Sequence, residues 1–273
     1  MLSTIRAKVA QWARRSFGQA SHYVGDGVIL ARLSNGLLIY LDGGDVSLTP
    51  SILVAGEWEP WVVRHFGPAV YPGAHVVDIG ANCGYYALLA AERTGPTGRV
   101  VAIEANPRLA HLVAKTFAVN GCGHWASIVN AAALDREGDI ELGVPGDYLG
   151  SASILMAPAE GNGVRAIKAR AAPLSQLLQG NLRVDVLKID AEGAEPLIWR
   201  GAQDVLGANR DIVVFMEFAP PMISQTCTPE QMLSEIRANG FAVEELTPAG
   251  IVEHTDNAAL LAKDWAELRL RRN

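Results

Sequence analysis

From residue 74 onward the chain alternates between short apolar segments and longer amphipathic segments. The apolar segments, such as "AHVVDIG" and "GRVVAIE", are rich in β-branched residues and predict strands that are buried on both faces. The segments between them predict helices, and strands that are joined through helices run parallel. The pattern therefore predicts an α/β fold with a doubly wound, mostly parallel sheet. The expected strands cover 74–80, 98–104, 126–132, 184–190 and 211–218, and the expected helices cover 85–95, 106–121, 173–179 and 228–241.

The segments that flank these elements have patterns of their own. Residues 28–42, "VILARLSNGLLIYLD", alternate on both sides of Asn35-Gly36 and predict a β-hairpin, because a two-residue turn of this kind needs positive φ at both positions. Residues 56–68 predict a short helix. Residues 138–170 predict short strands and loops inserted over the mouth of the sheet, and 259–271 predict an amphipathic end.

The first 17 residues predict an amphipathic helix with basic side chains on its polar face. Such a helix either lies on an anionic membrane surface, which would be a peripheral contact, or packs on its own domain. We favour packing. We expect residues 1–55 to form an N-terminal extension made of this helix and the hairpin, and residues 56–273 to form one domain.

The composition limits the partners and the compartment. The chain of 273 residues is 49% hydrophobic and 19% charged, as in globular proteins, and its net charge of −6 argues against a nucleic-acid partner. Cys83, Cys122 and Cys227 form no CxxC pair or Cys/His cluster, so we expect reduced thiols and no zinc site. No apolar run reaches the ~18 residues of a transmembrane helix. We expect a cytoplasmic protein.

The turn after the first expected strand, "VVDIGANCGYY", predicts a cofactor site. Gly80 and Gly84 let the backbone approach a ligand closely, and the helix that follows offers its N-terminal amides. Glu104, at the end of the second strand, is placed to accept hydrogen bonds from ribose hydroxyls. A pyrophosphate-binding turn would have glycine in place of Asn82. Asp78 would repel a pyrophosphate but attract the ammonium and sulfonium of S-adenosylmethionine, unless it only braces the loop.

Other nucleotide motifs are missing from the chain. It has neither the Y-x-x-x-K pairing of short-chain dehydrogenases nor the G-x-x-x-x-G-K-[ST] of P-loop enzymes. The loop therefore favours S-adenosylmethionine over a nicotinamide cofactor.

With these segments read, the chain resembles the FkbM family of S-adenosylmethionine-dependent methyltransferases. The resemblance is carried by "GEWEPW", "VVDIGANCGYYALLAA", "RVVAIEANPRLAHLVAKTFAVNG" with "NAAALDREGDIEL", and "VLKIDAEGAEPLIWRGA", over roughly residues 56–220. It implies a class I methyltransferase (Rossmann-like) sheet of seven strands, the last of them antiparallel. It also implies O-methylation of a small-molecule hydroxyl acceptor, typically a sugar or natural product.

The resemblance also implies roles for individual residues. The methionine half of the cofactor would lie against the loop after the first strand, and Glu104 and Asn106 would lie at the ribose. Asn130 and Ala132 fall where this sheet usually contacts adenine, and Glu59 is placed to close over the methionine end. The residues implied at the methionine half are Asp78, Gly80, Ala81, Asn82, Gly84 and Tyr85.

The stretch "VLKIDAEGAEP" places charges in and after an apolar strand. Lys188 and Asp190 share one face, and Asp190 lies at the carboxyl end of the strand, where the cofactor's methyl group would be. We favour Asp190 as a cofactor ligand or proton acceptor, with Lys188 pairing internally. Alternatively Asp190, Glu192 and Glu217 hold a divalent cation, or Lys188 pairs with a carboxylate only to join strands. Glu195 suits the first turn of the next helix. Glu217 faces acceptor or cofactor.

The expected chemistry is an in-line displacement in which a hydroxyl oxygen attacks the sulfonium methyl. His65, His75 and His111 are candidate general bases only if folding brings one of them to the site. Two functions of other classes remain as alternatives: a metal-dependent nucleotide-sugar glycosyltransferase, in which "DAE" replaces a D-x-D motif, and a non-catalytic cofactor-binding module. The sequence identifies neither the acceptor nor an oligomeric state.

Overall fold

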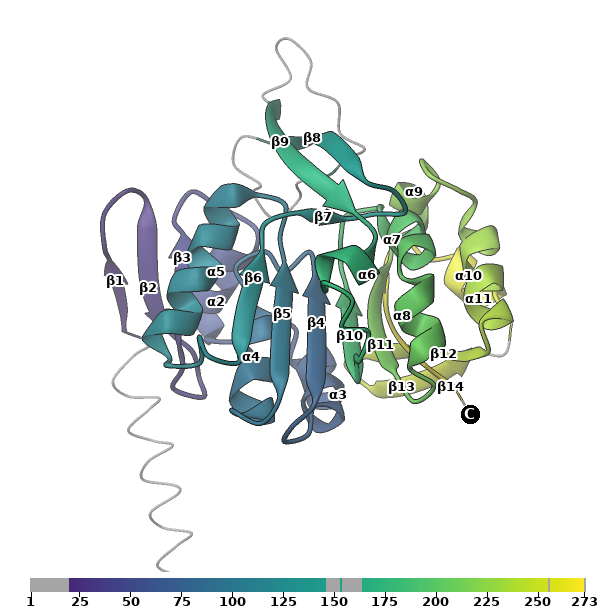
Figure 1. The fold of residues 1–273 in the computed structure, drawn as a ribbon, viewed down its shortest axis with the longest axis horizontal. Coiled ribbons are helices and arrows are strands. Elements are labelled where there is room, and N and C mark those ends of the chain that lie inside the picture. Colours follow the sequence, from purple (N-terminus) through teal and green to yellow (C-terminus); the bar gives the residue numbers. More distant parts are fainter. Residues whose placement is uncertain (1–19, 146–152, 154–163, 255, 273) are drawn as a thin grey trace, which may run out of the picture.

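The computed structural model of the protein describes residues 20–145, 153, 164–254 and 256–272. Its largest element is an eight-stranded sheet, which stands upright in Figure 1. The strands are β4 (His75–Ile79), β5 (Arg99–Ile103), β6 (Ala126–Val129), β10 (Val186–Ile189), β11 (Val213–Phe218), β12 (Phe241–Thr247), β13 (Gly250–His254) and β14 (Ala266–Arg272).

The order of the strands is that of a class I methyltransferase sheet with one additional edge strand. Across the sheet the order is β13-β12-β14-β11-β10-β4-β5-β6. The run from β11 to β6 is parallel, β14 is antiparallel to both of its neighbours, and β13 pairs antiparallel with β12. The predicted doubly wound, mostly parallel fold is therefore confirmed, and β13 is an addition to the seven strands that the resemblance implies.

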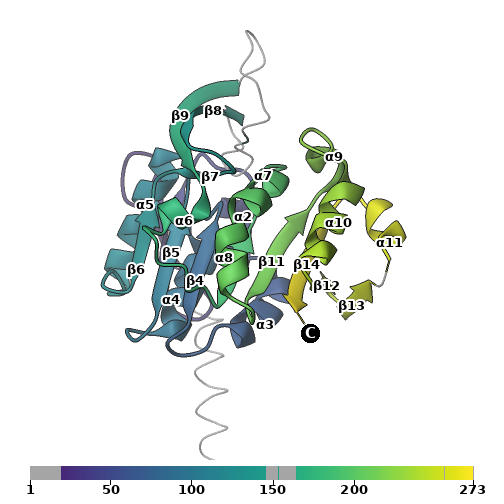
Figure 2. The same ribbon diagram turned by 45° about the vertical axis from the view of Figure 1, so that its right-hand side comes forward.

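Helices cover both faces of this sheet (Figures 1 and 2). One hydrophobic core lies between the sheet and the helices α3, α4 and α5, and a second lies between the sheet and α6, α7, α8 and α10. The helices are α2 (Leu48–Ala55), α3 (Pro60–Ala69), α4 (Tyr85–Thr94), α5 (Pro107–Val119), α6 (Leu174–Leu177), α7 (Glu195–Gly201), α8 (Gln203–Ala208), α9 (Pro220–Ile223), α10 (Pro229–Ala238) and α11 (Ala258–Leu261).

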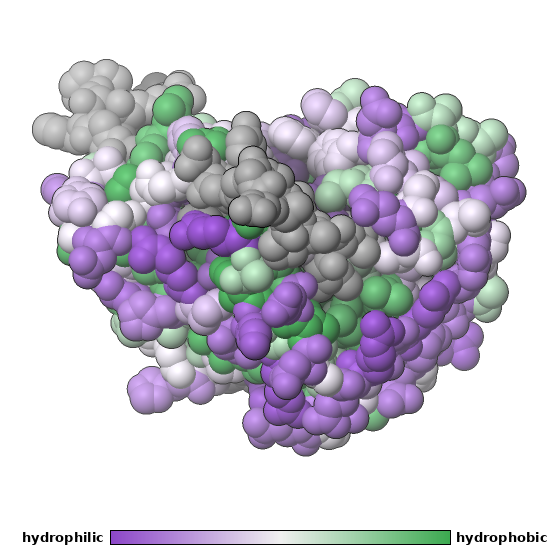
Figure 3. Space-filling view, turned by 90° about the horizontal axis from the view of Figure 1, so that it is seen from above, coloured by the Kyte–Doolittle hydropathy of each residue, from purple (hydrophilic) through white to green (hydrophobic). Residues whose placement is uncertain are grey.

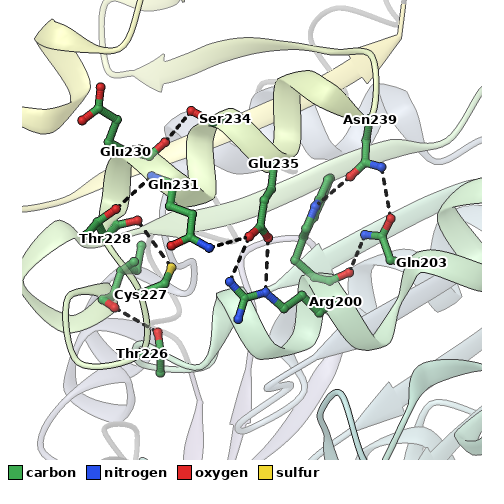
Figure 4. Close-up of polar contacts among 12 residues, drawn as sticks. Arg200, Gln203, Thr226, Cys227, Thr228, Glu230, Gln231, Ser234, Glu235 and Asn239 are labelled. Atoms are coloured by element: carbon green, nitrogen blue, oxygen red, sulfur yellow. Dashed lines mark hydrogen bonds and ion pairs between the residues drawn. The ribbon is translucent and has the colours of Figure 1, made fainter.

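Polar contacts join the helices on the second face (Figure 4). Arg200 of α7 pairs with Glu235 of α10 at 2.9 Å, and Gln231 donates to the same carboxylate at 3.0 Å. Asn239 donates to Gln203 at 3.1 Å. Arg200 lies near the end of α7 and Gln203 begins α8, so these contacts join this part of the chain to α10 and the residue that follows it.

A smaller sheet of β1 (Ser21–Tyr23), β2 (Val28–Arg32) and β3 (Leu38–Asp42) packs on α5. The predicted hairpin between β2 and β3 is confirmed, but its turn is longer than expected. β2 ends at Arg32 and β3 begins at Leu38. In the turn between them Gly36 has φ +97°, whereas Asn35 has no positive φ. The Gly36 amide bonds back to the Leu33 carbonyl, so one left-handed residue is enough to reverse the chain.

A third sheet lies beyond the carboxyl ends of the parallel strands, at the top of Figure 1. It consists of β7 (Ala132–Ala133), β8 (Gly138–Pro145) and β9 (Val164–Ala172). β9 pairs antiparallel with β8 and parallel with β7. The predicted third strand of the main sheet is therefore divided, because the chain leaves the sheet after β6 and re-pairs as β7.

The two ends of the chain were the hardest to predict. The expected N-terminal helix over 1–17 lies outside the described residues. The expected amphipathic end is divided between α11 and β14, and β14 is inserted between β11 and β12. Within the part of the chain that the structure describes, no helix is both long enough and apolar enough to cross a membrane.

Candidate active site

The loop after β4 is packed tightly between the neighbouring strands. Gly80 has φ +73°, and a Cβ added there would lie 1.7 Å from the Asp190 carbonyl oxygen. The amides of Gly80 and Ala81 both donate to the carbonyl of Ile103, at 3.0 and 3.1 Å. A side chain at position 80 would therefore separate β4 from the end of β10. Gly84 has another role. Its φ is +80° and a Cβ there would lie 2.9 Å from the Val113 side chain, so this glycine lets α4 approach α5 closely.

Glu104 is held at the end of β5 by two backbone amides. Its Oε2 accepts from the Asn82 amide at 2.8 Å, and its Oε1 accepts from the Asn106 amide at 2.7 Å. Burial raises the pKa of Glu104, and these hydrogen bonds oppose the rise. Each carboxylate oxygen keeps a further lone pair, so the fixed carboxylate can accept from hydroxyl groups. Asn106 also caps α5 by accepting from the Arg108 amide.

A cavity of about 600 Å³ opens beside this carboxylate; we call it the Glu104 cavity. Ala132, one of the predicted adenine contacts, lies in its wall. Asn130 does not, because its side chain is exposed and donates to the carbonyls of Glu104 and Ala105. The lining residues are Ile79, Gly80, Asn82, Ile103, Glu104, Ala105, Leu109, Ala131, Ala132, Ala133, Leu134, Leu142, Asp190, Ala191, Glu192, Ala194 and Ile198.

A second cavity of about 980 Å³, which we call the Trp265 cavity, lies next to the first. Four residues line both cavities: Gly80, Asn82, Asp190 and Glu192. The other residues that line the Trp265 cavity are Leu48, Trp58, Glu59, Trp61, Asp78, Ala81, Tyr85, Tyr86, Lys188, Glu217, Trp265 and Glu267. Figure 3 views the molecule from above, the side on which the carboxyl ends of the parallel strands lie. On this side hydrophilic residues border exposed apolar ones.

Lys188 is the central cation of the Trp265 cavity. It lies opposite Asp78 in the register of β10 and β4, and its Nζ is 2.7 Å from Asp190 Oδ2 and 4.6 Å from the centre of the Tyr86 ring. Burial alone would lower the pKa of Lys188, but the carboxylates around it, Asp190 first, raise the pKa above its ordinary value. Lys188 therefore stays protonated and cannot act as a base. It pairs internally with Asp190 rather than Asp78.

Several carboxylates face the same cavity without full pairing. Asp78 is 2% exposed and its Oδ2 has no hydrogen-bond partner. Burial raises its pKa to about 7, although the charge of Lys188 opposes this. Glu59 is anchored by the Tyr86 hydroxyl, which donates at 2.8 Å. Glu217 accepts from the Trp265 indole N–H at 2.9 Å through one oxygen only. An anionic site of this kind favours a positively charged ligand.

Strained backbone is concentrated at the same place. Among the described residues, five that are not glycine have positive φ, and three of them, Glu59 (43°), Asn82 (52°) and Glu192 (53°), line the Trp265 cavity. Each such conformation costs about 1–3 kcal/mol and persists only where the surroundings impose it, typically at functional sites.

Glu195, as predicted, begins α7, where its Oε1 accepts from the Ala191 amide at 2.8 Å.

The structure adds residues that the sequence did not single out. Trp58, Trp61, Tyr86, Trp265 and Glu267 all line the Trp265 cavity. For Glu267 the signal was present, because "AELRLR" alternates with period two and predicts a strand. None of the three candidate histidines (His65, His75 and His111) lines either cavity. His75 begins β4 and therefore lies at the opposite end of the strand from the loop.

The two cavities together fit S-adenosylmethionine. The described residues that line them include no arginine and one lysine, which is already paired, so a pyrophosphate would find little positive charge. The unpartnered oxygen of Asp78 suits an ammonium or sulfonium group. Among the described residues no three side chains of Asp, Glu, His or Cys are grouped as ligands for a metal ion.

Comparison with known proteins gives one family and one curated relative. Residues 78–243, more than half of the chain, match the family model described as the methyltransferase FkbM domain. The match begins after the "GEWEPW" segment. Over 65 residues the chain is 35% identical to protein-L-isoaspartate O-methyltransferase 1 of Archaeoglobus fulgidus, which is 24% of this chain and 30% of that relative.

Solved structures with similar folds share little sequence with the chain. The O-methyltransferase from Bacillus cereus, determined in complex with SAH, has a TM-score of 0.47 and 13% identity, over 82% of this chain and 86% of that one. The methyltransferase FkbM from Methylobacillus flagellatus has a TM-score of 0.45 and 12% identity, over 72% of this chain and 43% of that one.

Proposed function

The chain belongs to the FkbM methyltransferase family, and we propose that it transfers the methyl group of S-adenosylmethionine to a hydroxyl of a sugar or natural-product small molecule. Dependence on S-adenosylmethionine follows from the family. The nature of the acceptor and of the methylated atom is the proposal.

One observation carries the proposal: Gly80, Asn82, Asp190 and Glu192 line both cavities. A ligand as long as S-adenosylmethionine would extend from one cavity into the other across these residues. In this arrangement Glu104 would accept from the ribose hydroxyls, with adenine in the remainder of the Glu104 cavity. Asp78 would face the positively charged methionine half. The methyl group would then lie where the Trp265 cavity can hold an acceptor.

The bound cofactor supplies an activated methyl group on a sulfonium, and the protein has to align the acceptor with it. Asp190 lies at the junction of the cavities, with its side chain 32% exposed. The protonated Lys188 beneath it fixes the direction of the carboxylate through the 2.7 Å ion pair. Asp190 would orient the acceptor hydroxyl or accept its proton. Glu217 lies further from the junction, in the wall of the Trp265 cavity.

The glycosyltransferase alternative has less support in the lining. A nucleotide sugar carries a pyrophosphate, which would have to be bound by a metal ion or by arginine and lysine side chains. The described residues of the two cavities offer one lysine, which is paired with Asp190. The other charged side chains of the described lining are carboxylates, which would repel the diphosphate.

The proposal is tested by incubating the purified protein with isotopically labelled S-adenosylmethionine and a library of small-molecule hydroxyl compounds. Mass spectrometry would detect the labelled products, and nuclear magnetic resonance would identify the atom that carries the methyl. We expect a methyl ether. A methyl group on nitrogen or carbon, or no transfer to any hydroxyl compound, would contradict the proposal.

A further inference from the structure

The Trp265 cavity contains more carboxyl groups than a neutral hydroxyl acceptor would need. Its lining includes six carboxylates and a single cation, Lys188, which is paired with Asp190. The carboxylates are Glu59, Asp78, Asp190, Glu192, Glu217 and Glu267. No arginine or histidine is present among the described lining residues. Buried carboxylates of this number repel one another, so something positive has to face them or they have to be protonated.

Glu217 and Glu267 form a pair on β11 and β14, which lie on the other side of β10 from β4 and Gly80. They are direct partners in the register of β11 and β14, so both side chains project from the same face of the sheet. Their side chains are 9% and 1% exposed, and each has an Oε2 without a hydrogen-bond partner. Two adjacent buried carboxylates, each with a free oxygen, are suited to receive a donor with several N–H groups.

The pair is bordered by an aromatic wall. The indole N–H of Trp265 donates to Glu217 Oε1 at 2.9 Å, which leaves Oε2 free, and Trp265 is 41% exposed. Trp58 and Trp61 line the same cavity. Indole faces attract cations through their quadrupole and also pack against the C–H face of a sugar ring. Carboxylates and indoles together therefore point to an organic cation.

The cofactor does not supply enough positive charge for these carboxylates. S-adenosylmethionine carries one ammonium, one sulfonium and one carboxylate, a net charge of +1. In the arrangement proposed above, its positive groups lie near Asp78, beside Gly80. Glu217 and Glu267 are on strands beyond β10, and Lys188, which attracts Glu267, is already paired with Asp190.

A divalent cation fits the cavity less well than an organic one. A hard metal ion needs several oxygen ligands that converge on one point. Among the described residues no group of three such side chains has that arrangement. The carboxylates are instead distributed around the cavity, as a larger cation with several contact points would require.

A bound cation would change the charge state of the pair. Burial raises the pKa of Glu217 well above its ordinary value, and the neighbouring carboxylates Asp190, Glu195 and Glu192 raise it further. Burial likewise raises the pKa of Glu267, against the attraction of Lys188. A cation bound between them would reverse this effect, because it stabilises both ionised carboxylates.

We propose that the acceptor carries a protonated amine as well as the hydroxyl that is methylated, and that Glu217 and Glu267 bind this amine beside Trp265. The acceptor class is therefore an amino sugar or another basic hydroxyl compound. Trp265 and Glu267 lie outside residues 78–243, which match the family model, whereas Glu217 lies within them. This inference rests on the proposed function.

The test uses pairs of methyl glycosides that differ only in one ring substituent, an amine in one member and a hydroxyl in the other. Each is titrated calorimetrically into the protein at pH 7 with saturating S-adenosylhomocysteine and a chelator. We expect the amino member of at least one pair to bind about ten-fold more tightly, or better. Equal binding of both members in every pair, tighter binding of the neutral members, or no binding of any amino member would overturn the inference.

Variants then locate the amine. Glu217→Gln and Glu267→Gln keep the shape and remove the charge, and we expect each to reduce the preference for the amino member. Glu253→Gln, on the exposed part of β13, is the matched control and should leave the preference unchanged. A preference that survives in the double variant Glu217→Gln/Glu267→Gln would overturn the assignment. If a variant fails to fold, the preference of the natural protein still decides whether the acceptor is basic.

The same samples separate this inference from the proposed function. Labelled methyl transfer to neutral hydroxyl compounds only, without binding of the amino members, would leave the proposed function standing and reject the amine. Preferential binding of amino members with the label found on nitrogen would support the amine site and reject O-methylation.

Discussion

Lys188 and Asp190 form an ion pair of 2.7 Å in which only the lysine is buried. The Lys188 side chain is 1% exposed, whereas the Asp190 side chain is 32% exposed. The lysine lies on the buried face of the sheet, against Tyr86, and the aspartate reaches the junction of the two cavities. The charge of Lys188 therefore fixes a carboxylate that is accessible to ligands. This relationship explains why an apolar strand contains a lysine.

Asp190→Asn should reduce turnover by about 10²–10⁴-fold if the carboxylate accepts the proton of the acceptor hydroxyl. Asparagine keeps the size of the side chain and removes its charge. The fold should survive, because Lys188 also has Glu267, Glu59 and Asp78 as carboxylate neighbours. Methyl-transfer rates and a thermal melt of the variant check both expectations. Turnover within a few-fold of the natural protein would exclude Asp190 from the reaction.

Turnover should survive exhaustive chelation. Within the described chain the carboxylates of the Trp265 cavity are not grouped as metal ligands. A metal ion at Asp190 would also be repelled by the positive charge of Lys188, which is paired with the same carboxylate. The assay is methyl transfer after treatment with a chelator, repeated with added magnesium or manganese. Activity that disappears and returns with metal would instead make Asp190, with Glu192 or Glu217, a metal site.

Asp78→Asn should stabilise the ligand-free protein at pH 8 but not at pH 4. Burial raises the pKa of Asp78 from 3.8 to about 7, so the folded protein binds a proton there that the unfolded chain has lost. The stability that the protonated form contributes is complete below the unfolded pKa and is lost as the pH rises through about 7. Asparagine does not ionise, so the variant avoids this loss in the free energy of unfolding, which is of the order of 2–4 kcal/mol.

Urea unfolding of both proteins between pH 4 and pH 8 measures this effect. Burial is the chief cause that lowers the pKa values of His65 and His75. A lowered histidine pKa makes the free energy of unfolding rise with pH, which is opposite to the effect of Asp78. These histidines are present in both proteins, so they cancel in the difference. A constant difference between natural protein and variant across this range would show that Asp78 is ionised in the folded state throughout.

Asp78→Asn should also weaken the binding of S-adenosylmethionine more than that of S-adenosylhomocysteine. The donor has a sulfonium charge that the product lacks, and asparagine removes the attraction for it without changing the shape of the loop. Calorimetric titration of both ligands at pH 8, where Asp78 is largely ionised, gives the comparison. Equal losses would mean that Asp78 contacts a group that both ligands share, such as the amino group.

The elements that were predicted correctly from the sequence are those whose signals are local. The apolar run of β4 and the amphipathic pattern of α5 depend on residues close together in the chain, and both elements are as expected. The hairpin was found for the same reason, although its turn type was not. β14 was not predicted as a strand, although "AELRLR" alternates with period two, and its place between β11 and β12 depends on two distant strands, which no local pattern encodes.

Within the site, the sequence indicated single residues better than their partners. Asp78, Glu104 and Asp190 stand directly after or within apolar strands, which makes a buried charge visible in the sequence. Which carboxylate pairs with Lys188 depends on side-chain direction. Trp265 and Glu217 are brought together only by the pairing of β14 with β11, so their hydrogen bond could not be predicted.

The placement of the cofactor ribose at Glu104 can be measured directly with a protein-and-ligand cycle. Dissociation constants are determined by calorimetry for S-adenosylhomocysteine and its 2′,3′-dideoxy analogue, with the natural protein and with Glu104→Ala. Glu253→Gln serves as the control variant, and circular dichroism confirms that each protein is folded. Because Glu104 also accepts from the Asn82 and Asn106 amides, a loss of affinity in the variant alone would not separate contact from loop support.

The coupling between the two changes does separate them. If Glu104 accepts from the ribose hydroxyls, the natural protein should prefer the hydroxylated ligand and Glu104→Ala should have lost that preference, with a coupling free energy of about 1.5–3 kcal/mol. If the variant retains the full preference, so that the coupling is near zero, the ribose does not lie at Glu104 and the cofactor arrangement proposed for the two cavities is wrong.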